Sequence, residues 1–254
     1  MLDTDHVPRL SSRAPIKALP GYYANERGRR HFVNDLFDGS ARDYDHIERL
    51  LALGSGSSYR RHALRRAGLA PGMRVLDVAT GTGLVAREAL ATVGSGGSVV
   101  GLDPSAGMLA EAHRGLSITF VRGRGEKLPL SGAAFDFVSM GFALRHVSDL
   151  DLLFGEFRRV LKPGGVVCLL EISRPRLRTV AALLRIFMTR AVPAMARIAR
   201  RHSDARRLMD FYWDTIDACV PPEAVLAALA RSGFDSPRRA VSLGMFSEYV
   251  AKKS

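Results

Sequence analysis

The sequence has little cysteine and no long uninterrupted apolar run. Only two cysteines occur among 254 residues, Cys168 within an apolar stretch and Cys219 far from it. Such a pair excludes a disulfide framework and a zinc site built from cysteines, so we expect no metal and a reducing cytoplasm. The polar stretch 1–10 and the shortness of apolar runs such as 166–170 predict neither a signal peptide nor an integral membrane protein.

Acidic residues are also scarce relative to basic ones. The formal net charge is +12, and much of the excess lies in residues 174–207, which contain ten arginines and one acid, Asp204. This stretch indicates either an anionic membrane surface as a peripheral partner or solvated helix faces with an arginine-rich composition. Nucleic acid is not expected as a partner, because no aromatic base-stacking platform or base-flipping motif is visible.

Short apolar segments alternate with helical segments after residue 72. This alternation is typical of βαβ units, and right-handed crossovers then predict an α/β fold with a Rossmann-like, doubly wound, mainly parallel sheet of about seven strands. The expected strands are 74–78, 98–102, 118–121, 135–139 and 166–171, and the helices between them are 84–93, 106–114 and 150–161.

The flanking segments complete the predicted domain. Residues 1–30 lack periodicity and are expected to form a flexible N-terminal arm, whereas 31–254 are long enough for one large domain that begins with helices. A helical insertion over 174–217 precedes the last helix and a hairpin of strands. Because ligands bind outside the carboxyl ends of the strands, this insertion is expected to form a cap on the substrate side.

The first predicted strand delivers Asp77 and then a Gly81-x-Gly83 turn into a helix. Such glycines allow a tight turn and a close approach to a ligand at a helix N-terminus. Asp103, at the end of the next strand, is suited to accept from ribose hydroxyls. The glycines are compatible with NAD or with S-adenosylmethionine (SAM). Asp77 favours SAM, because a carboxylate would repel a pyrophosphate and attract an ammonium and a sulfonium.

Together the motifs resemble those of class I SAM-dependent methyltransferases, and within that class those of the ubiquinone/menaquinone biosynthesis C-methyltransferases. The resemblance implies a SAM-dependent methyltransferase domain over 31–254 that methylates a lipophilic aromatic or quinol-type small molecule at carbon, in the cytoplasm or at the membrane periphery. The motifs are Phe37-Asp38, Tyr44-Asp45, LDVATGTG (76–83), VVGLDPSAGML (99–109), Phe120-Val121, Glu126-Lys-Leu-Pro129, FDFVSMGFALRHVSDL (135–150), RRVLKPGG (158–165) and LLEISRP (169–175).

The resemblance also implies a cofactor site. Its residues would lie at the methionine end (Asp77, Gly81, Gly83), the ribose (Asp103) and the adenine (Met108), with Thr80, Pro104, Gly125, Glu126, Gly141 and Tyr44 completing the site. Where the family usually has Gly-Asp-Ala-Glu, this chain has Gly123-Arg-Gly-Glu126. We therefore expect backbone groups of Gly125 to recognise the adenine in place of an acidic side chain.

Two residues after the fourth strand are the catalytic candidates. A ring carbon becomes nucleophilic when an adjacent hydroxyl ionises, which requires a base or a cation beside the phenolate. Arg145 matches the arginine of the family's Gly-Leu-Arg-Asn run and would stabilise the phenolate. His146 replaces the asparagine and would titrate near neutrality if unperturbed.

Other functions stay open on the sequence alone. They are O- or N-methylation of a soluble specialised metabolite, methylation of nucleic acid, and SAM binding without catalysis. A homodimer is compatible with the sequence as well.

Overall fold

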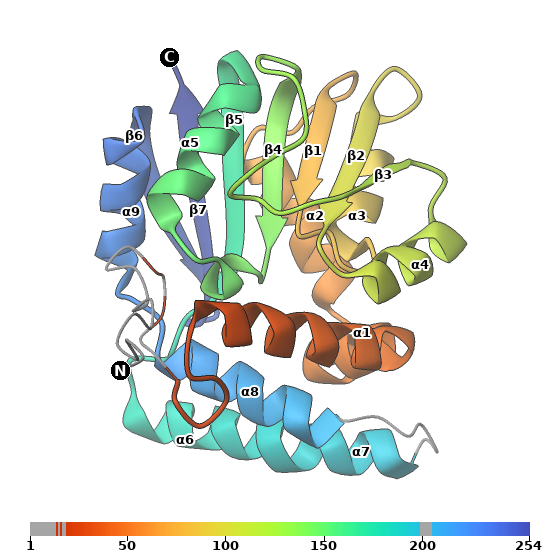
Figure 1. Cartoon of the computed structure of the whole chain (residues 1–254), viewed down its shortest axis with the longest axis vertical. Coiled ribbons are helices and arrows are strands. Elements are labelled where there is room, and N and C mark those ends of the chain that lie inside the picture. Colours follow the sequence, from red (N-terminus) through yellow and green to blue (C-terminus); the bar gives the residue numbers. More distant parts are fainter. Residues whose placement is uncertain (1–13, 15, 17–18, 199–204) are drawn as a thin grey trace, which may run out of the picture.

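The fold is built on one seven-stranded sheet (Figure 1). This computed structural model describes residues 14, 16, 19–198 and 205–254. The strand order is β3-β2-β1-β4-β5-β7-β6, in which β1 to β5 are parallel and β7 runs antiparallel to both neighbours. The strands are β1 (Arg74–Val78), β2 (Ser98–Asp103), β3 (Thr119–Arg122), β4 (Phe135–Gly141), β5 (Leu161–Ile172), β6 (Phe234–Ser242) and β7 (Phe246–Lys253).

The doubly wound, mainly parallel sheet is therefore confirmed, and two strands begin four or five residues before their predicted starts, which are residue 166 for β5 and about residue 238 for β6. β5 begins at Leu161, five residues early, because Leu161 pairs with Phe135 across a register shift in β4. β6 begins at Phe234 because a bulge between Asp235 and Arg238 lets the strand continue past Pro237.

Helices cover both faces of the sheet (Figure 1). On one face, α5 (Leu150–Val160) packs on α9 (Pro222–Arg231), and Phe154, Phe157 and Leu229 join a buried cluster with the sheet. On the other face, α2 (Gly56–Arg66) packs on α3 (Leu84–Val93). The helix α4 (Ala106–Gly115) connects β2 to β3. Both apolar faces of the sheet are thereby buried, which leaves its carboxyl edge for a ligand.

A helical cap lies below that carboxyl edge (Figure 1). It has its own apolar core, in which Leu36 and Ile47 meet Met188, Leu208 and Phe211. Helices therefore occupy 178–198 and 205–217 of the predicted insertion 174–217, and residues 199–204 lie outside the description. The cap consists of α1 (Glu26–Leu51), α6 (Arg178–Ile186), the π-helical turn η2 (Phe187–Ala191), α7 (Val192–Ile198) and α8 (Ala205–Asp217).

The N-terminal boundary needs a correction. Helix α1 begins at Glu26, so residues 26–30 of the predicted arm are helical. The reason is local, because the Asn25 side chain accepts from the Gly28 backbone N–H at 2.8 Å and caps the first turn. Of the remaining arm, residues 1–13, 15, 17 and 18 lie outside the described part of the chain.

Candidate functional site

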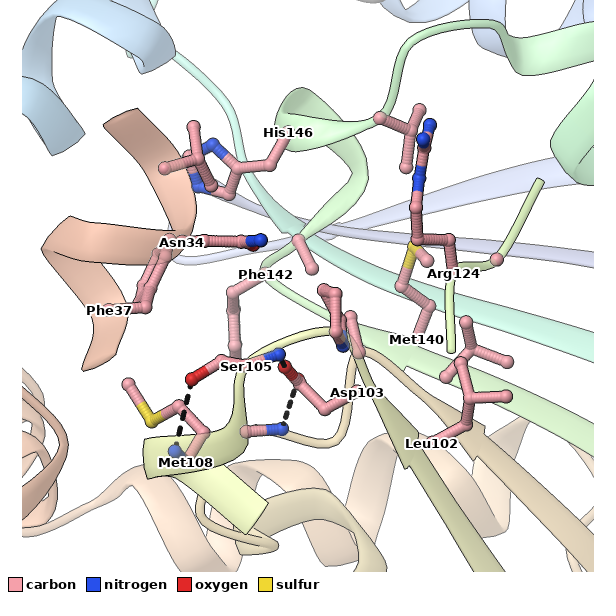
Figure 2. Close-up of a pocket in the computed structure, with 18 of the residues that line it drawn as sticks. Asn34, Phe37, Leu102, Asp103, Ser105, Met108, Arg124, Met140, Phe142 and His146 are labelled. Carbon is pink, nitrogen blue, oxygen red and sulfur yellow. Dashed lines mark hydrogen bonds between the residues drawn. The ribbon is translucent and has the colours of Figure 1, made fainter. Parts of the chain in front are cut away.

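A cavity lies between the carboxyl edge of the sheet and helix α1. Its space, including the open mouth, is about 990 Å³. One side carries Asp103, Ser105 and Met108, and the opposite side carries His146 and Phe37 (Figure 2). The cavity is thus positioned where open α/β sheets bind their ligands.

Asp103 is the acidic group on the sheet side of the cavity. Its two carboxylate oxygens accept from the backbone N–H groups of Gly81 and Ser105, each at 2.8 Å. Burial raises the pKa of this carboxyl to about 6, although the two N–H donors work in the opposite direction. The carboxylate is therefore fixed in orientation, and each oxygen retains a lone pair for a ligand hydroxyl.

The backbone around Asp103 has conformations that allow a ligand to approach it closely. Gly81 has φ +57°, and the two non-glycine residues that follow β1 and β4, Ala79 and Phe142, have φ +54° and +59°. Left-handed backbone at such residues costs about 1–3 kcal/mol and concentrates at functional sites. At Gly125, a Cβ atom would lie 2.5 Å from Leu153 Cδ1, so any other residue would force the buried Leu153 side chain to move. These four positions all line the cavity.

Asp77 occupies a different place from the one that the sequence reasoning gave it. Among the described residues that line the cavity, Asp77, Thr80 and Gly83 are missing. The Asp77 carboxylate accepts from the hydroxyls of Thr80 and Ser139, each at 2.6 Å, and burial raises its pKa to about 6. The Asp77 carboxylate thus stabilises the loop that contains Thr80, from the side away from the cavity. This geometry does not place the Asp77 carboxylate in direct contact with a ligand ammonium or sulfonium.

Four other predicted cofactor residues come from the segments that follow β2 and β3. Pro104, Met108, Gly125 and Glu126 all line the cavity. The Glu126 carboxylate accepts from the Ser148 backbone N–H at 2.7 Å, so it stabilises the loop after β4 while bordering the cavity. Their contacts with the cofactor stay a prediction.

Arg124, which departs from the family pattern, also lines this region (Figure 2). It donates to the Ser148 hydroxyl at 3.2 Å and to Glu126 at 3.4 Å. Its side chain therefore lies along the cavity wall and is not merely directed to solvent.

Helix α1 is tied to the sheet by two of its carboxylates. Asp38 accepts from the Gly107 backbone N–H at 2.8 Å and from the Ser105 hydroxyl, at the start of α4. Asp45 accepts from the Thr82 hydroxyl at 2.5 Å, within the glycine turn. These bonds fix the part of α1 that carries Phe37 and Tyr44, the two aromatic residues that precede Asp38 and Asp45 and line the cavity.

Arg145 does not face the cavity, which corrects the predicted role of its guanidinium. The side chain is fully buried and forms an ion pair with Glu171, and its Nε donates to the Thr215 hydroxyl at 3.0 Å. Its guanidinium also lies 4.9 Å from the centre of the Tyr212 ring. Arg145 therefore connects the loop after β4 to α8, and it lies behind the Tyr212 ring that borders the cavity. Sequence alone could not reveal this, because Glu171 and Thr215 are distant in the chain.

His146 does line the cavity, at the end of the short helix η1 (Leu144–His146). Its ring stacks on Phe211 at 5.5 Å between centroids and meets the edge of Phe37 at 5.4 Å. Neither ring nitrogen has a hydrogen-bond partner among the described residues, and both are buried. Burial, with the charges of Arg145 and Arg29, holds the pKa of the imidazole well below its usual range. The imidazole is therefore perturbed, so the condition for titration near neutrality is not met, and the ring is neutral at physiological pH.

Several cavity residues escaped the sequence reasoning. Tyr212 from α8, and Asn34 and Arg29 from α1, border the cavity. Arg29 donates to the backbone oxygens of His146 and Val147 at 2.8 and 3.0 Å and so fixes the loop that carries the imidazole. Their position in amphipathic helices gave no chemical signal, because such residues resemble ordinary cap packing. Gly141 and Tyr44, which were predicted, line the cavity too.

The fold and the site define a class. A doubly wound sheet of this strand order carries a rigid carboxylate after β2 and a glycine turn after β1. Solved SAM-dependent methyltransferases share the fold, including phosphoethanolamine N-methyltransferase 2 of Haemonchus contortus in complex with SAM (TM-score 0.63, 18% identity, 89% of this chain and 60% of that chain). A SAM-dependent methyltransferase from Aquifex aeolicus has a TM-score of 0.60 at 20% identity, over 83% and 98% of the chains. The protein is a class I SAM-dependent methyltransferase, because a methyltransferase family profile also matches residues 24–238.

The family follows from the sequence as a whole. This chain belongs to the ubiE/COQ5 methyltransferase family, whose profile matches residues 24–238. It is 30% identical to the ubiquinone/menaquinone biosynthesis C-methyltransferase of Geotalea daltonii, over 90% of this chain and 98% of that protein. It is also 36% identical to the demethylmenaquinone methyltransferase of a Parafrankia species, over 68% and 75% of the chains.

Proposed function

We propose that the protein transfers the methyl group of SAM to a ring carbon of a reduced, quinone-type lipophilic acceptor. The observation that carries the proposal is the composition of the cavity half opposite Asp103. Phe37, Tyr44 and Tyr212 border that half together with His146, whose ring lies 5.4 Å from the Phe37 ring and 6.2 Å from the Tyr212 ring between centroids. Flat apolar walls of this kind suit an aromatic ring, and the relatives named for quinone methylation support the same acceptor class.

The cofactor fits the remaining half of the cavity. Asp103 would accept from the ribose hydroxyls, the backbone at Gly81 and Gly141 would border the methionine part, and Met108 would pack against adenine. SAM, when bound, supplies an electrophilic methyl carbon on a sulfonium. The chain supplies position, because α1 and α8 close over the ring and exclude water from it.

The test is methyl transfer from SAM to demethylmenaquinol, produced by reduction of the quinone in detergent micelles. We expect S-adenosylhomocysteine and an acceptor heavier by one methyl group, with the new methyl on ring carbon in the NMR spectrum. The oxidised quinone serves as the matched control and is expected to be inert, because it has no hydroxyl to ionise. Methylation at oxygen, or turnover only of a soluble amine or phenol, would contradict the proposal and support the O- or N-methyltransferase alternative.

We further propose that the arginine-rich segment 174–207 places this enzyme on an anionic membrane surface, on its cytoplasmic side. Among the described residues, the continuous helical stretch 178–197 is long and apolar enough to cross a membrane by length and composition alone. The sequence reasoning considered only uninterrupted apolar runs and therefore missed it, since Arg185 and Arg190 interrupt this helix. One face of the stretch is occupied by the cap core, which contains Met188 and Val192.

The free face of α6 supports contact with a membrane surface better than a crossing. Leu177, Leu183 and Ile186 are 68%, 67% and 54% exposed, and arginines such as Arg178 and Arg185 are exposed beside them. Helix α6 also lies at the margin of the cap farthest from the sheet (Figure 1). Apolar side chains flanked by arginine favour the interface of an anionic bilayer, where each basic residue contributes about 1 kcal/mol.

Vesicle flotation tests this surface. Binding to phosphatidylserine-containing vesicles is expected, with little binding to neutral vesicles and a steep loss as salt is raised. The double variant Leu183→Glu/Ile186→Glu is expected to lose binding, whereas Leu152→Glu, an exposed leucine on α5, serves as the matched control and is expected to retain it. Equal binding to neutral and anionic vesicles would contradict the proposal. Formation of a homodimer stays a prediction, tested by sedimentation in the same buffers.

A further inference from the structure

We infer that His146 is the group that removes the proton from the acceptor's ring hydroxyl. This inference rests on the proposed function, because it concerns a hydroxylated aromatic acceptor. The first support is position, since the imidazole lines the cavity half that is bordered by aromatic side chains (Figure 2). The second is that both ring nitrogens are buried and lack a partner in the described ranges 14, 16, 19–198 and 205–254. An unpaired buried polar group costs about 1–3 kcal/mol, which a hydroxyl on a bound ring would offset.

The surroundings of the imidazole keep it in the form that accepts a proton. Arg145 precedes it in η1, Arg29 faces it from α1, and Tyr44 and Tyr212 face it from α1 and α8. Arg145 pairs with Glu171 and Arg29 pairs with Glu26, yet burial and the two guanidinium charges still disfavour the protonated ring before an acceptor binds. A phenolate formed beside the ring reverses this balance, since the new negative charge stabilises both the imidazolium and itself.

The ring is also held in place. Stacking on Phe211 and the edge of Phe37 fixes its plane, and the Arg29 guanidinium fixes its backbone through the bond to the His146 oxygen at 2.8 Å. The two tyrosine hydroxyls bond to each other at 2.8 Å, and in this arrangement neither is bonded to the imidazole. A ligand hydroxyl that meets either nitrogen would therefore displace no hydrogen bond of the described residues.

The proposed step balances as follows. A ring nitrogen of His146 takes the hydroxyl proton, and the O–H electron pair stays on the oxygen as a phenolate. The ortho carbon of that ring forms the bond to the methyl carbon, the C–S bond breaks, and its electron pair leaves with the sulfur of S-adenosylhomocysteine. The methylated carbon then loses its proton to water while the imidazolium returns its proton to the oxygen, which restores the aromatic ring. One proton is released overall.

The experiment compares the wild type with His146→Phe, which retains a flat ring between Phe37 and Phe211 but cannot accept a proton. Single-turnover methyl transfer at pH 7 is expected to fall by about 100-fold or more, within the range for loss of general base catalysis. S-adenosylhomocysteine affinity, measured by calorimetry, is expected to stay unchanged. His146→Asn serves as a second variant should the phenylalanine disturb folding. His113→Asn, on α4 outside the cavity lining, is the matched control and is expected to retain full activity.

The pH profile separates a base from a packing residue. The wild-type rate is expected to decline only below pH 6.5, because the imidazole stays neutral above its lowered pKa. In the variants the rate should instead rise about tenfold per pH unit, following the ionisation of a phenol with a pKa of about 10 in water. An acceptor whose electron-withdrawing substituent lowers its own pKa should recover much of the loss. Equal losses for both acceptors, with an unchanged pH profile, would overturn the inference.

A binding measurement tests the same proton transfer without turnover. With the protein saturated with S-adenosylhomocysteine, a nitrophenol is expected to bind to the wild type as the yellow phenolate and to His146→Phe as the colourless phenol. The same colour in both proteins would overturn the inference. If no quinol is methylated by the wild type but the colour difference persists, the proposed function fails and the assignment of His146 stands.

Discussion

Removal of the Arg145 guanidinium is expected to affect stability more than chemistry. The variant Arg145→Ala leaves the carboxylate of Glu171 in a buried site without its charge partner. Breaking such a pair costs about 3–5 kcal/mol. Glu171 Oε1 keeps one donor, the Ile172 backbone N–H at 2.8 Å, which favours the lower part of this range. The lost bond to Thr215 adds about 1 kcal/mol, so the sum stays near 4 kcal/mol.

A loss of this size is a large share of the 5–15 kcal/mol that usually stabilises a domain. Urea unfolding followed by circular dichroism measures it, with Arg206→Ala as the matched control. Arg206 belongs to an exposed pair with Asp210 at 3.8 Å, which contributes at most about 1 kcal/mol. The double variant Arg145→Met/Glu171→Leu is expected to recover much of the stability, because it removes both buried charges.

One outcome would refute this reasoning. If Arg145→Ala unfolds within about 1 kcal/mol of the wild type but loses methyl transfer to a bound acceptor, the guanidinium acts on the acceptor directly and does not serve the cap. A stability loss with preserved turnover at low temperature would support the role derived from burial.

Two predictions concern the carboxylates on the sheet side. Asp103→Asn is expected to weaken S-adenosylhomocysteine binding by about 1.5–3 kcal/mol, or roughly 10- to 150-fold, because a charged acceptor for the ribose hydroxyls is lost; calorimetry showing the wild-type affinity in a folded variant would contradict the assignment. The second follows from the pKa values of Asp77 and Asp103, which burial raises to about 6, above those of the unfolded chain. The folded, ligand-free protein therefore binds these protons more tightly, and their contribution to stability is greatest near pH 4 and falls as pH rises through 6. Unfolding at pH 5 and pH 7 should reveal this difference in the wild type and a smaller one in Asp77→Asn/Asp103→Asn; identical pH dependence in both proteins would count against it.

Local patterns in the sequence determined much of the fold. Strand periodicity, helix limits and the glycine turn are set by neighbouring residues, so the sheet, its crossovers and the positions of Gly81 and Asp103 followed from the sequence alone. The family resemblance added the cofactor, which the fold and the relatives confirm.

Tertiary structure decided the roles of individual charged groups. Asp77 and Arg145 stand in the motifs beside residues that line the cavity, yet both side chains are buried behind it, paired with Ser139 and Glu171. His146 lies one residue from Arg145 and faces the cavity, because consecutive residues of a tight turn point in different directions. Sequence fixes spacing along the chain, whereas orientation and pKa depend on partners that are brought together only when the cap closes over the sheet.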